Sequence, residues 1–420
     1  MHDLMRGIWR KMPDFVRHSS LTRTLAANVQ MAFLEMRMRS HGFRPNREKP
    51  PIKGPVVIGG FFRSASGIGE AARACYRALN AAGLSPLAVD LTEAITRVDL
   101  TPDIPLSKFP DDRSGTLLLY VNPPELLSAV AQLGFLKGRR WRIIGCWMWE
   151  LSIFPREWHR AFKYVSEIWA PSIYCKSSLQ SRPDAPPVHV IPVPVTAQGE
   201  IGADRARFGI PPNCFTALTM ADTYSSFSRK NPVAAIHAFR AAFKDRMDAR
   251  LIIKTRNLDQ APAARKLLDD AIGGAANIEI LDATLSEAER LILIKSVDAV
   301  LSLHRAEGFG LVPAEAMLMG TPVIATGWSG NLDFMNAESS LLVGYRLTAV
   351  HDPFGIYRND AAQWAEPDIE HAAKLLSRLA ADPEGAAAAG RVGQRQIIET
   401  CGARQVGERM AKLLTAPSAE

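Results

Sequence analysis

Residues 304–317 read HRAEGFGLVPAEAM, and their arrangement decides the fold. Glu307 and Glu315 stand on either side of a Gly-Phe-Gly turn and a proline, Pro313. The six residues before this stretch, 298–303, form a short apolar run that is typical of a buried strand. The stretch therefore begins where a strand ends.

A helix is expected to follow the turn, over about residues 313–319. Proline suits a first helical position because its missing N–H is not needed there, and Gly320 is a suitable stop. This places Glu307 on the loop and Glu315 in the first helical turn.

The junction between this loop and helix is a candidate anion site. The free N–H groups and the dipole at a helix N-terminus favour a negative ligand, and Gly308 and Gly310 allow a ligand to approach the backbone closely. Glu307 would lie beside a bound phosphate and accept hydrogen bonds from hydroxyl groups. A nucleotide sugar fits this pattern; a plain strand–turn–helix with a capping glutamate fits it equally well.

The same alternation of strands and helices extends outward through the chain, which favours an α/β fold with doubly wound parallel sheets. Expected strands lie at residues 55–62, 116–121, 141–147, 167–170, 214–220, 250–255, 277–281, 298–303 and 321–325. Expected helices include residues 70–79, 232–243 and 286–296, with further helices towards the C-terminus.

The proline-rich stretch 188–195 divides this pattern into two halves, because proline ends regular structure. We expect one Rossmann-like domain over 51–200 and a second over 201–420, with the last helix possibly crossing back. Ligands bind at the carboxyl ends of the strands in such sheets, so a ligand cleft should lie between the two domains.

The net charge is concentrated in residues 1–50, which hold ten Lys/Arg and four Asp/Glu and thus +6 of the chain's +7. Apolar residues at helical spacing predict basic amphipathic helices there, for which an anionic membrane surface or packing on the protein are the two interpretations. The nearly neutral remainder argues against a nucleic-acid partner.

The five cysteines are scattered and form no CxxC pair, which argues against disulfides or a zinc site. No signal peptide and no run long enough to span a membrane is visible. We expect a cytoplasmic protein, attached peripherally to the inner face of the cell membrane if residues 1–50 bind lipid.

Four segments resemble family 4 retaining glycosyltransferases, which have the GT-B fold. EGFGLVPAE (307–315) resembles the family's Glu-x7-Glu signature, and FFRSASGIGEAAR (61–73) resembles its glycine loop. SSFSRKNPVAAIHAFRAAF (225–243) is similar to its basic loop and helix, and WELSIFPREW (149–158) to a bacterial surface-polysaccharide subgroup. The resemblance covers roughly residues 55–415.

The resemblance implies a role for each matching residue. Glu307 would contact the donor sugar, with Arg229 and Lys230 neutralising the diphosphate as the other catalytic residues. Glu315 would hold the ribose hydroxyls. The remaining donor-binding residues would be Gly67, Lys254, Gly308, Phe309, Gly310 and Leu311.

This chain departs from the family at two places. Asn122 stands where many members carry a histidine, and a neutral amide cannot do a histidine's proton chemistry. Tyr224 stands where an arginine is common. Asn122 and Glu150 are the acceptor-side candidates; Glu150 could equally be a plain strand-end carboxylate, and His304 either faces the cleft or is a hydrogen-bonded structural residue.

The resemblance implies a hexosyltransferase that retains anomeric configuration and uses no cofactor, with GDP-mannose or UDP-glucose as donor. The chain lacks an Asp-x-Asp triplet, so basic residues and helix N–H groups would replace a metal. The acceptor would be a lipid-linked oligosaccharide of bacterial exopolysaccharide biosynthesis. The alternatives are an epimerase or phosphorylase on the same fold, or a non-catalytic nucleotide-binding subunit.

Overall fold

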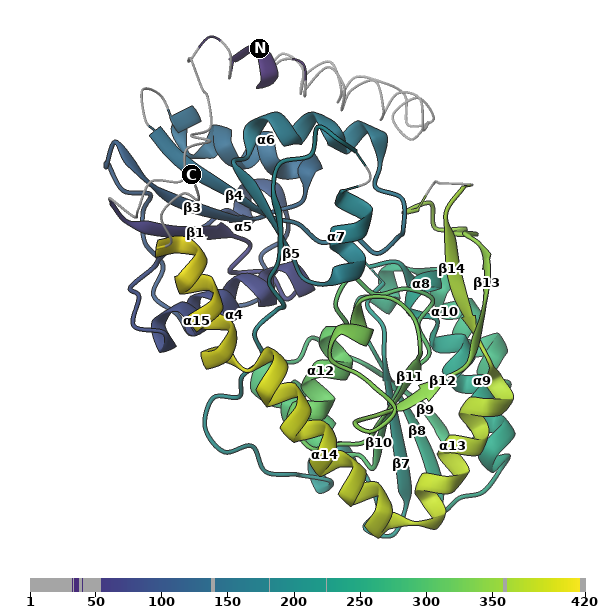
Figure 1. The fold of residues 1–420 in the computed structure, drawn as a ribbon. Coiled ribbons are helices and arrows are strands. Elements are labelled where there is room, and N and C mark those ends of the chain that lie inside the picture. Colours follow the sequence, from purple (N-terminus) through teal and green to yellow (C-terminus); the bar gives the residue numbers. More distant parts are fainter. Residues whose placement is uncertain are drawn as a thin grey trace.

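The computed structural model contains two α/β domains, each built on a six-stranded parallel sheet (Figure 1). It describes residues 54–136, 140–180, 182–223, 225–357 and 361–415, together with residues 32, 34–37 and 40. The architecture confirms the predicted fold class of two facing Rossmann-like domains. The predicted amphipathic segment, 1–50, lies almost entirely outside the described residues.

The N-terminal sheet has the strand order β2-β1-β3-β4-β5-β6. Its central strands are mostly buried because helices cover both faces of the sheet. The strands are β1 (Val56–Gly60), β2 (Leu87–Asp90), β3 (Ser114–Tyr120), β4 (Arg140–Cys146), β5 (Glu167–Ala170) and β6 (Val188–Val190). The main helices are α4 (Gly67–Ala81), α5 (Thr92–Ile95), α6 (Pro123–Gln132) and α7 (Ile173–Leu179).

The C-terminal sheet has the order β12-β11-β10-β7-β8-β9. Its strands are β7 (Phe215–Met220), β8 (Ala249–Thr255), β9 (Ile278–Asp282), β10 (Ala299–Ser302), β11 (Val323–Thr326) and β12 (Leu341–Val343). Its helices are α8 (Phe227–Lys230), α9 (Pro232–Phe243), α10 (Pro262–Ile272), α11 (Glu287–Ser296), α12 (Leu311–Leu318) and α13 (Ile369–Ala381).

Each sheet reverses its strand order at one point, between β1 and β3 in the first domain and between β7 and β10 in the second. The loops that follow these strands diverge and leave a crevice at the carboxyl edge of the sheet. The loop after β10 carries Glu307, and the loop after β7 leads into α8 with Arg229 and Lys230. The topology alone therefore brings these segments together.

Several sequence expectations need correction. The stretch 188–195, expected as the inter-domain hinge, begins with β6, which pairs with β5. Helix α12 begins at Leu311, so Pro313 is its third residue and Glu315 lies beyond its first turn. The helix starts early because Gly310 caps it with a φ of 99°, a conformation that glycine adopts readily.

The last two helices, α14 (Pro383–Cys401) and α15 (Ala403–Thr415), run from the second domain back to the first (Figure 1). In the first domain, α15 packs on α4, where a Cβ atom on Gly407 would lie only 2.1 Å from the carbonyl oxygen of Ala78. Buried Arg142 of β4 donates to the carbonyl oxygen of Leu413 at 3.2 Å. This contact satisfies a carbonyl that the end of a helix leaves free.

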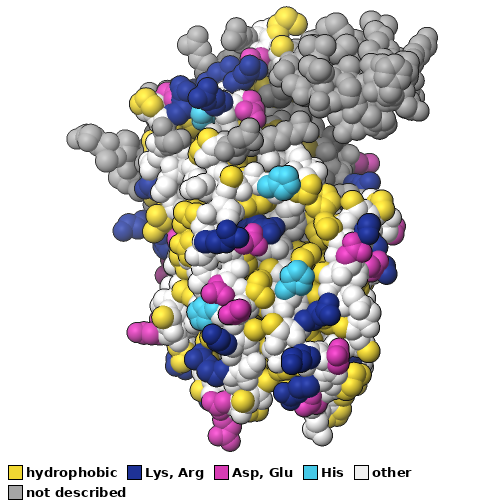
Figure 2. All heavy atoms as spheres, turned by 90° about the vertical axis from the view of Figure 1, so that its right-hand side faces the viewer, with side chains coloured by type: hydrophobic (Ala, Val, Ile, Leu, Met, Phe, Trp, Pro, Cys, Tyr) yellow, Lys and Arg dark blue, Asp and Glu magenta, His cyan; other side chains and the backbone are white. Residues whose placement is uncertain are grey.

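The surface seen in Figure 2 carries basic and acidic side chains side by side over the second domain. A search of the described residues for a helix long and apolar enough to cross a membrane finds none.

Candidate active site

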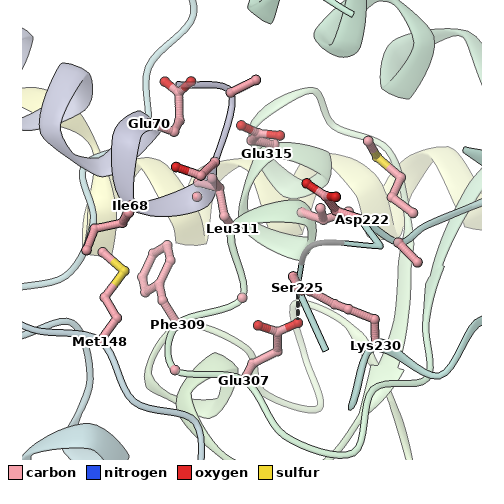
Figure 3. Close-up of a pocket in the computed structure, with 18 of the residues that line it drawn as sticks. Ile68, Glu70, Met148, Asp222, Ser225, Lys230, Glu307, Phe309, Leu311 and Glu315 are labelled. Carbon is pink, nitrogen blue, oxygen red and sulfur yellow. Dashed lines mark hydrogen bonds and ion pairs between the residues drawn. The ribbon is translucent and has the colours of Figure 1, made fainter. Parts of the chain in front are cut away.

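A cavity of about 470 Å³ lies between the domains at the carboxyl edges of both sheets. Loops from both domains line it, and its charged groups face each other across the cleft (Figure 3). All of the predicted site residues line this one cavity: Gly67, Asn122, Glu150, Arg229, Lys230, Lys254, Glu307, Gly308, Phe309, Gly310, Leu311 and Glu315.

The loop after β10 is held tightly by its neighbours. The backbone N–H of Glu307 donates to Ser329 Oγ at 2.8 Å, and Ser329 itself has a φ of 76°, which is rare for a residue other than glycine. Gly308 O accepts a 2.7 Å bond from Ser172 Oγ of the first domain. A Cβ atom on Gly330 would lie 2.2 Å from that same oxygen. The loop is therefore fixed before a ligand arrives.

Glu307 is buried in a cluster of opposite charges (Figure 3). Its carboxylate oxygens lie 2.5 Å from Lys230 Nζ and 3.0 Å from an Arg229 guanidinium nitrogen. Burial by itself would raise the pKa of Glu307, but the charges of Lys230 and Arg229 lower it to about 2. Glu307 is thus an anion at any physiological pH.

Arg229 and Lys230 reach Glu307 because α8 is a single short turn. Ser226 caps this turn by accepting from the Arg229 N–H, and Asn231 ends it with a φ of 53°. Arg229 is only 4% exposed and also donates to the carbonyl oxygen of Ala306 at 2.8 Å. It is therefore a buried residue that also lines the cavity.

Glu315 lies at the other end of the cavity in a second ionic cluster. Arg290 of α11 binds both of its carboxylate oxygens, at 2.9 and 2.7 Å. Arg290 also lies 3.5 Å from Glu70 of α4, in the opposite domain. From Glu70 the cluster continues to Arg77, which pairs with Glu287 at 2.8 Å. This cluster joins the two domains directly beside the cavity.

Lys254, near the end of β8, adds a further basic group. Burial lowers its pKa to about 8, and nearby Arg256 acts in the same direction. Arg256 lies 3.3 Å from Asp99 of the first domain and donates to Asp222 at 3.0 Å. Lys254 is therefore a cation whose charge changes close to neutral pH.

The first domain contributes a less charged wall. Asn122 Oδ1 accepts the backbone N–H of Met148 at 2.9 Å, and Glu150 accepts the hydroxyl of Tyr357 at 2.8 Å. Gly67 has open space where a side chain would be. This leaves room above the phosphate region predicted at the start of α12.

His304 is fully buried, and neither ring nitrogen has a hydrogen-bond partner among the described residues. One interpretation of the sequence makes His304 a hydrogen-bonded structural residue. The expected hydrogen bonds are absent among the described residues, although the side chain is buried as a structural residue would be. Burial lowers the pKa of His304 to about 4, so the ring is neutral at pH 7. Tyr224, the other residue that departs from the family pattern, lies outside the described residues.

Sequence reasoning missed several side chains that shape the site: Glu70, Arg256, Arg290, Ser329 and Tyr357. Glu70 and Arg290 each lie on a helix that the sequence predicted. The contact between these two helices, which belong to different domains, produces no local sequence pattern from which it could be predicted. Tyr357 lies in the loop that connects the two strands of a hairpin, β13 (Tyr345–Ala349) and β14 (Gln363–Pro367), and the sequence pattern did not predict this hairpin.

Comparison with known proteins agrees with this geometry. A family profile described as "Family 4 Glycosyltransferase in conflict systems" matches residues 174–396, which is more than half of the chain. The chain belongs to the family 4 glycosyltransferases. The match includes α8, α12 and both glutamates of the signature. No curated protein matches the sequence of this glycosyltransferase.

Solved structures show the same GT-B fold. Sucrose-phosphate synthase from Thermosynechococcus elongatus is similar to this glycosyltransferase at a TM-score of 0.61 and 16% identity, over 86% of this chain and 98% of that one. Anabaena HepE in complex with UDP and glucose is similar at a TM-score of 0.59 and 15% identity, over 86% of this chain and 99% of that one. At these identities the likeness concerns the fold alone.

S. aureus TarM is a longer relative of the same fold, solved in complex with fondaparinux, alpha-GlcNAc-glycerol and UDP. It gives a TM-score of 0.52 at 12% identity, over 72% of this chain. This chain spans about half of the length of TarM, with 55% covered.

Proposed function

We propose that this chain transfers a hexose from a nucleotide-diphosphate sugar to a hydroxyl group of a lipid-linked oligosaccharide, with retention of anomeric configuration. The observation that carries the proposal is the meeting of Glu307, Lys230 and Arg229 where the loop after β10 turns into α12. A fixed anion and two cations stand beside free helix N–H groups there, at the wall of a cavity of nucleotide-sugar size.

Charge on the leaving diphosphate has to be stabilised during transfer. Lys230 is partly exposed to the cavity and has further N–H donors besides the one on Glu307, so it can reach a phosphate oxygen. Lys254 supplies a second cation and the start of α12 supplies backbone N–H groups. These groups act without a metal ion, which is why we propose a metal-independent enzyme with no cofactor.

Retention follows if the acceptor attacks the face that the diphosphate leaves. The acceptor oxygen forms a bond to the anomeric carbon, the bond from that carbon to the phosphate oxygen breaks, and the acceptor proton passes to the departing phosphate. Glu307 accepts hydroxyl hydrogen bonds from the donor sugar and holds its ring in place. Glu315, on α12, holds the ribose, and Glu307, on the loop before α12, holds the sugar at the other end of the donor.

GDP-mannose and UDP-glucose are the proposed donors. The bound UDP and glucose of the HepE structure are compatible with the second, and the resemblance of residues 149–158 to a polysaccharide subgroup favours the first. A thermal-shift panel of nucleotide sugars identifies the donor, because a ligand that prefers the folded state raises its melting temperature.

The basic residues of 1–50 support a peripheral site on the inner face of the cell membrane, as expected for polysaccharide assembly on a lipid carrier. Deleting residues 1–50 should release the protein from anionic liposomes. Equal liposome binding by the shortened and the full chain would contradict this part of the proposal.

The reaction is tested with purified enzyme and candidate nucleotide sugars. Transfer predicts a glycosylated product, and the release of nucleoside diphosphate should increase when an acceptor is present. Conversion of the donor to an isomeric nucleotide sugar would identify an epimerase instead, and binding without turnover would identify a non-catalytic subunit.

A further inference from the structure

Glu150 is the carboxylate of the first domain that lies nearest to the catalytic cluster. It belongs to the turn after β4, and its Cγ would lie 3.7 Å from a Cβ atom placed on Gly308. The turn that carries Glu150 therefore packs directly against the turn that carries Glu307. Both carboxylates line the same cavity.

Arg229 lies between these two carboxylates. One of its guanidinium nitrogens lies 3.0 Å from Glu307 Oε2, and the other lies 3.7 Å from Glu150 Oε1. The first distance is that of a close ion pair, and the second is too long for a hydrogen bond. The charge of Arg229 is thus largely balanced by Glu307, and Glu150 Oε1 keeps its capacity to accept a hydrogen bond.

The other oxygen of Glu150 is held by Tyr357. The phenol donates to Glu150 Oε2 at 2.8 Å, and its ring packs against Trp149 at 5.4 Å between centroids. Burial raises the pKa of Tyr357 far above its ordinary value, so the phenol remains a donor. Glu150 is therefore oriented by one oxygen and presents the other to the cavity.

The second acceptor-side candidate, Asn122, has a different contact. Its side-chain oxygen binds the backbone N–H of Met148, two residues before Glu150. This bond fixes the turn after β4. Asn122 is thus a positioning residue for that turn, which leaves Glu150 as the acceptor-side candidate with an oxygen directed to the cavity.

We infer that Glu150 binds a hydroxyl of the acceptor sugar next to the hydroxyl that attacks the donor, and that the acceptor end is a neutral sugar. This inference rests on the proposed transferase function. An ionised carboxylate only accepts hydrogen bonds, so it favours hydroxyl donors and disfavours a phosphate or carboxylate at the same place. The attacking hydroxyl remains free to give its proton to the departing phosphate.

The test compares Glu150→Gln with the wild-type enzyme, with Glu157→Gln as the matched control. Glu157 lies in the same segment and is exposed. The acceptor probes are octyl glucoside and octyl mannoside, with octyl phosphate as the anionic probe, and the readout is the release of nucleoside diphosphate. Donor affinity is measured separately by thermal shift.

We expect the octyl glycosides, and not octyl phosphate, to accelerate release by the wild-type enzyme. Glu150→Gln should raise the KM for the glycoside about 10- to 100-fold, as for loss of a charge-assisted hydrogen bond, with donor affinity unchanged. Tyr357→Phe should have an effect below about 5-fold, because Glu150 itself remains. Glu157→Gln should behave as the wild type.

Three results would overturn the inference: an unchanged glycoside KM in Glu150→Gln, acceleration by octyl phosphate alone, or no acceleration by either glycoside. An effect of Tyr357→Phe as large as that of Glu150→Gln would assign Glu150 a purely structural role and would also overturn it. Failure of the proposed function is a separate result: the wild-type protein binds no nucleotide sugar, releases no nucleoside diphosphate from any donor with or without an acceptor, or converts the donor to an isomeric nucleotide sugar.

Discussion

The two signature glutamates sit in ionic clusters of different construction. Glu307 is paired with Lys230 and Arg229, and all three belong to the second domain. Glu315 is paired with Arg290, which also faces Glu70 of the first domain. The group next to the reacting bond is therefore fixed within one domain, whereas the group at the nucleoside end depends on how the two domains meet.

The clusters also differ in electrostatic balance. At Glu307, two cations overcome the cost of burial and lower the pKa to about 2. At Glu315, burial prevails and raises the pKa, although Arg290 opposes this shift. Glu307 is thus ionised with a wide margin, whereas at Glu315 Arg290 and, more weakly, Arg73 oppose a shift that favours the neutral carboxyl group.

The largest expected effect comes from Glu307→Gln. The amide leaves Lys230 and Arg229 without their anion and weakens the contact with the donor sugar, so kcat should fall about 10²- to 10³-fold. Steady-state transfer assays measure this loss. Glu338→Gln, an exposed glutamate of the same domain, is the control. A kcat within a few-fold of the wild type would remove Glu307 from the mechanism.

Glu315→Gln should act on binding more than on chemistry. Loss of a charged acceptor for the ribose hydroxyls should raise the donor KM about 10- to 100-fold and change kcat by less. Donor titrations of the transfer rate separate the two constants. A fall in kcat with an unchanged donor KM would contradict the assignment of Glu315 to donor binding and of Glu307 to the chemical step.

Arg290→Gln tests the difference between the two glutamates through the pH dependence of the donor KM. Without Arg290, burial raises the pKa of Glu315 further, so a larger share of this carboxylate is protonated at lower pH and the donor KM rises as pH falls. We expect a KM several-fold above that of the wild type at pH 6, with partial recovery at pH 8. Equal ratios at both pH values would contradict this coupling.

The smallest effect should come from Lys254. Its pKa of about 8 means that the charge is present below pH 8 and is lost as pH rises above that value, so affinity for UDP or GDP should weaken there by a few-fold. Lys254→Arg keeps its charge at all these pH values and should give a flat profile. Nucleotide titrations between pH 7 and 9 measure both curves.

Two features of the second domain were predicted closely from the sequence. Helix α9 has the predicted bounds, Pro232–Phe243, because proline marks its start and a regular apolar face follows. Residues around the loop after β10 could be placed together because the topology of a parallel sheet brings the ends of its strands to one edge.

The limits of the sequence prediction have physical causes. Pro313 was predicted at the first position of the helix but is its third residue, because a positive φ at Gly310 lets α12 begin at Leu311. The hairpin of β13 and β14 was missed because its strands are short and one of them is largely exposed. The contact of Arg290 with Glu70 joins helices 220 positions apart, and no local pattern encodes such a pair.

The return of α15 to the first domain has a consequence for synthesis. Residues 54–190 are synthesised before the second domain, whereas α15, the helix that packs on α4, is synthesised after it. Until it arrives, the apolar surface of α4 that surrounds Cys75 and Ala78 has no cover, because Met410 and Gly407 supply it. The nascent first domain should therefore need a chaperone, or tolerate a loosely packed state, until residues 403–415 have been synthesised.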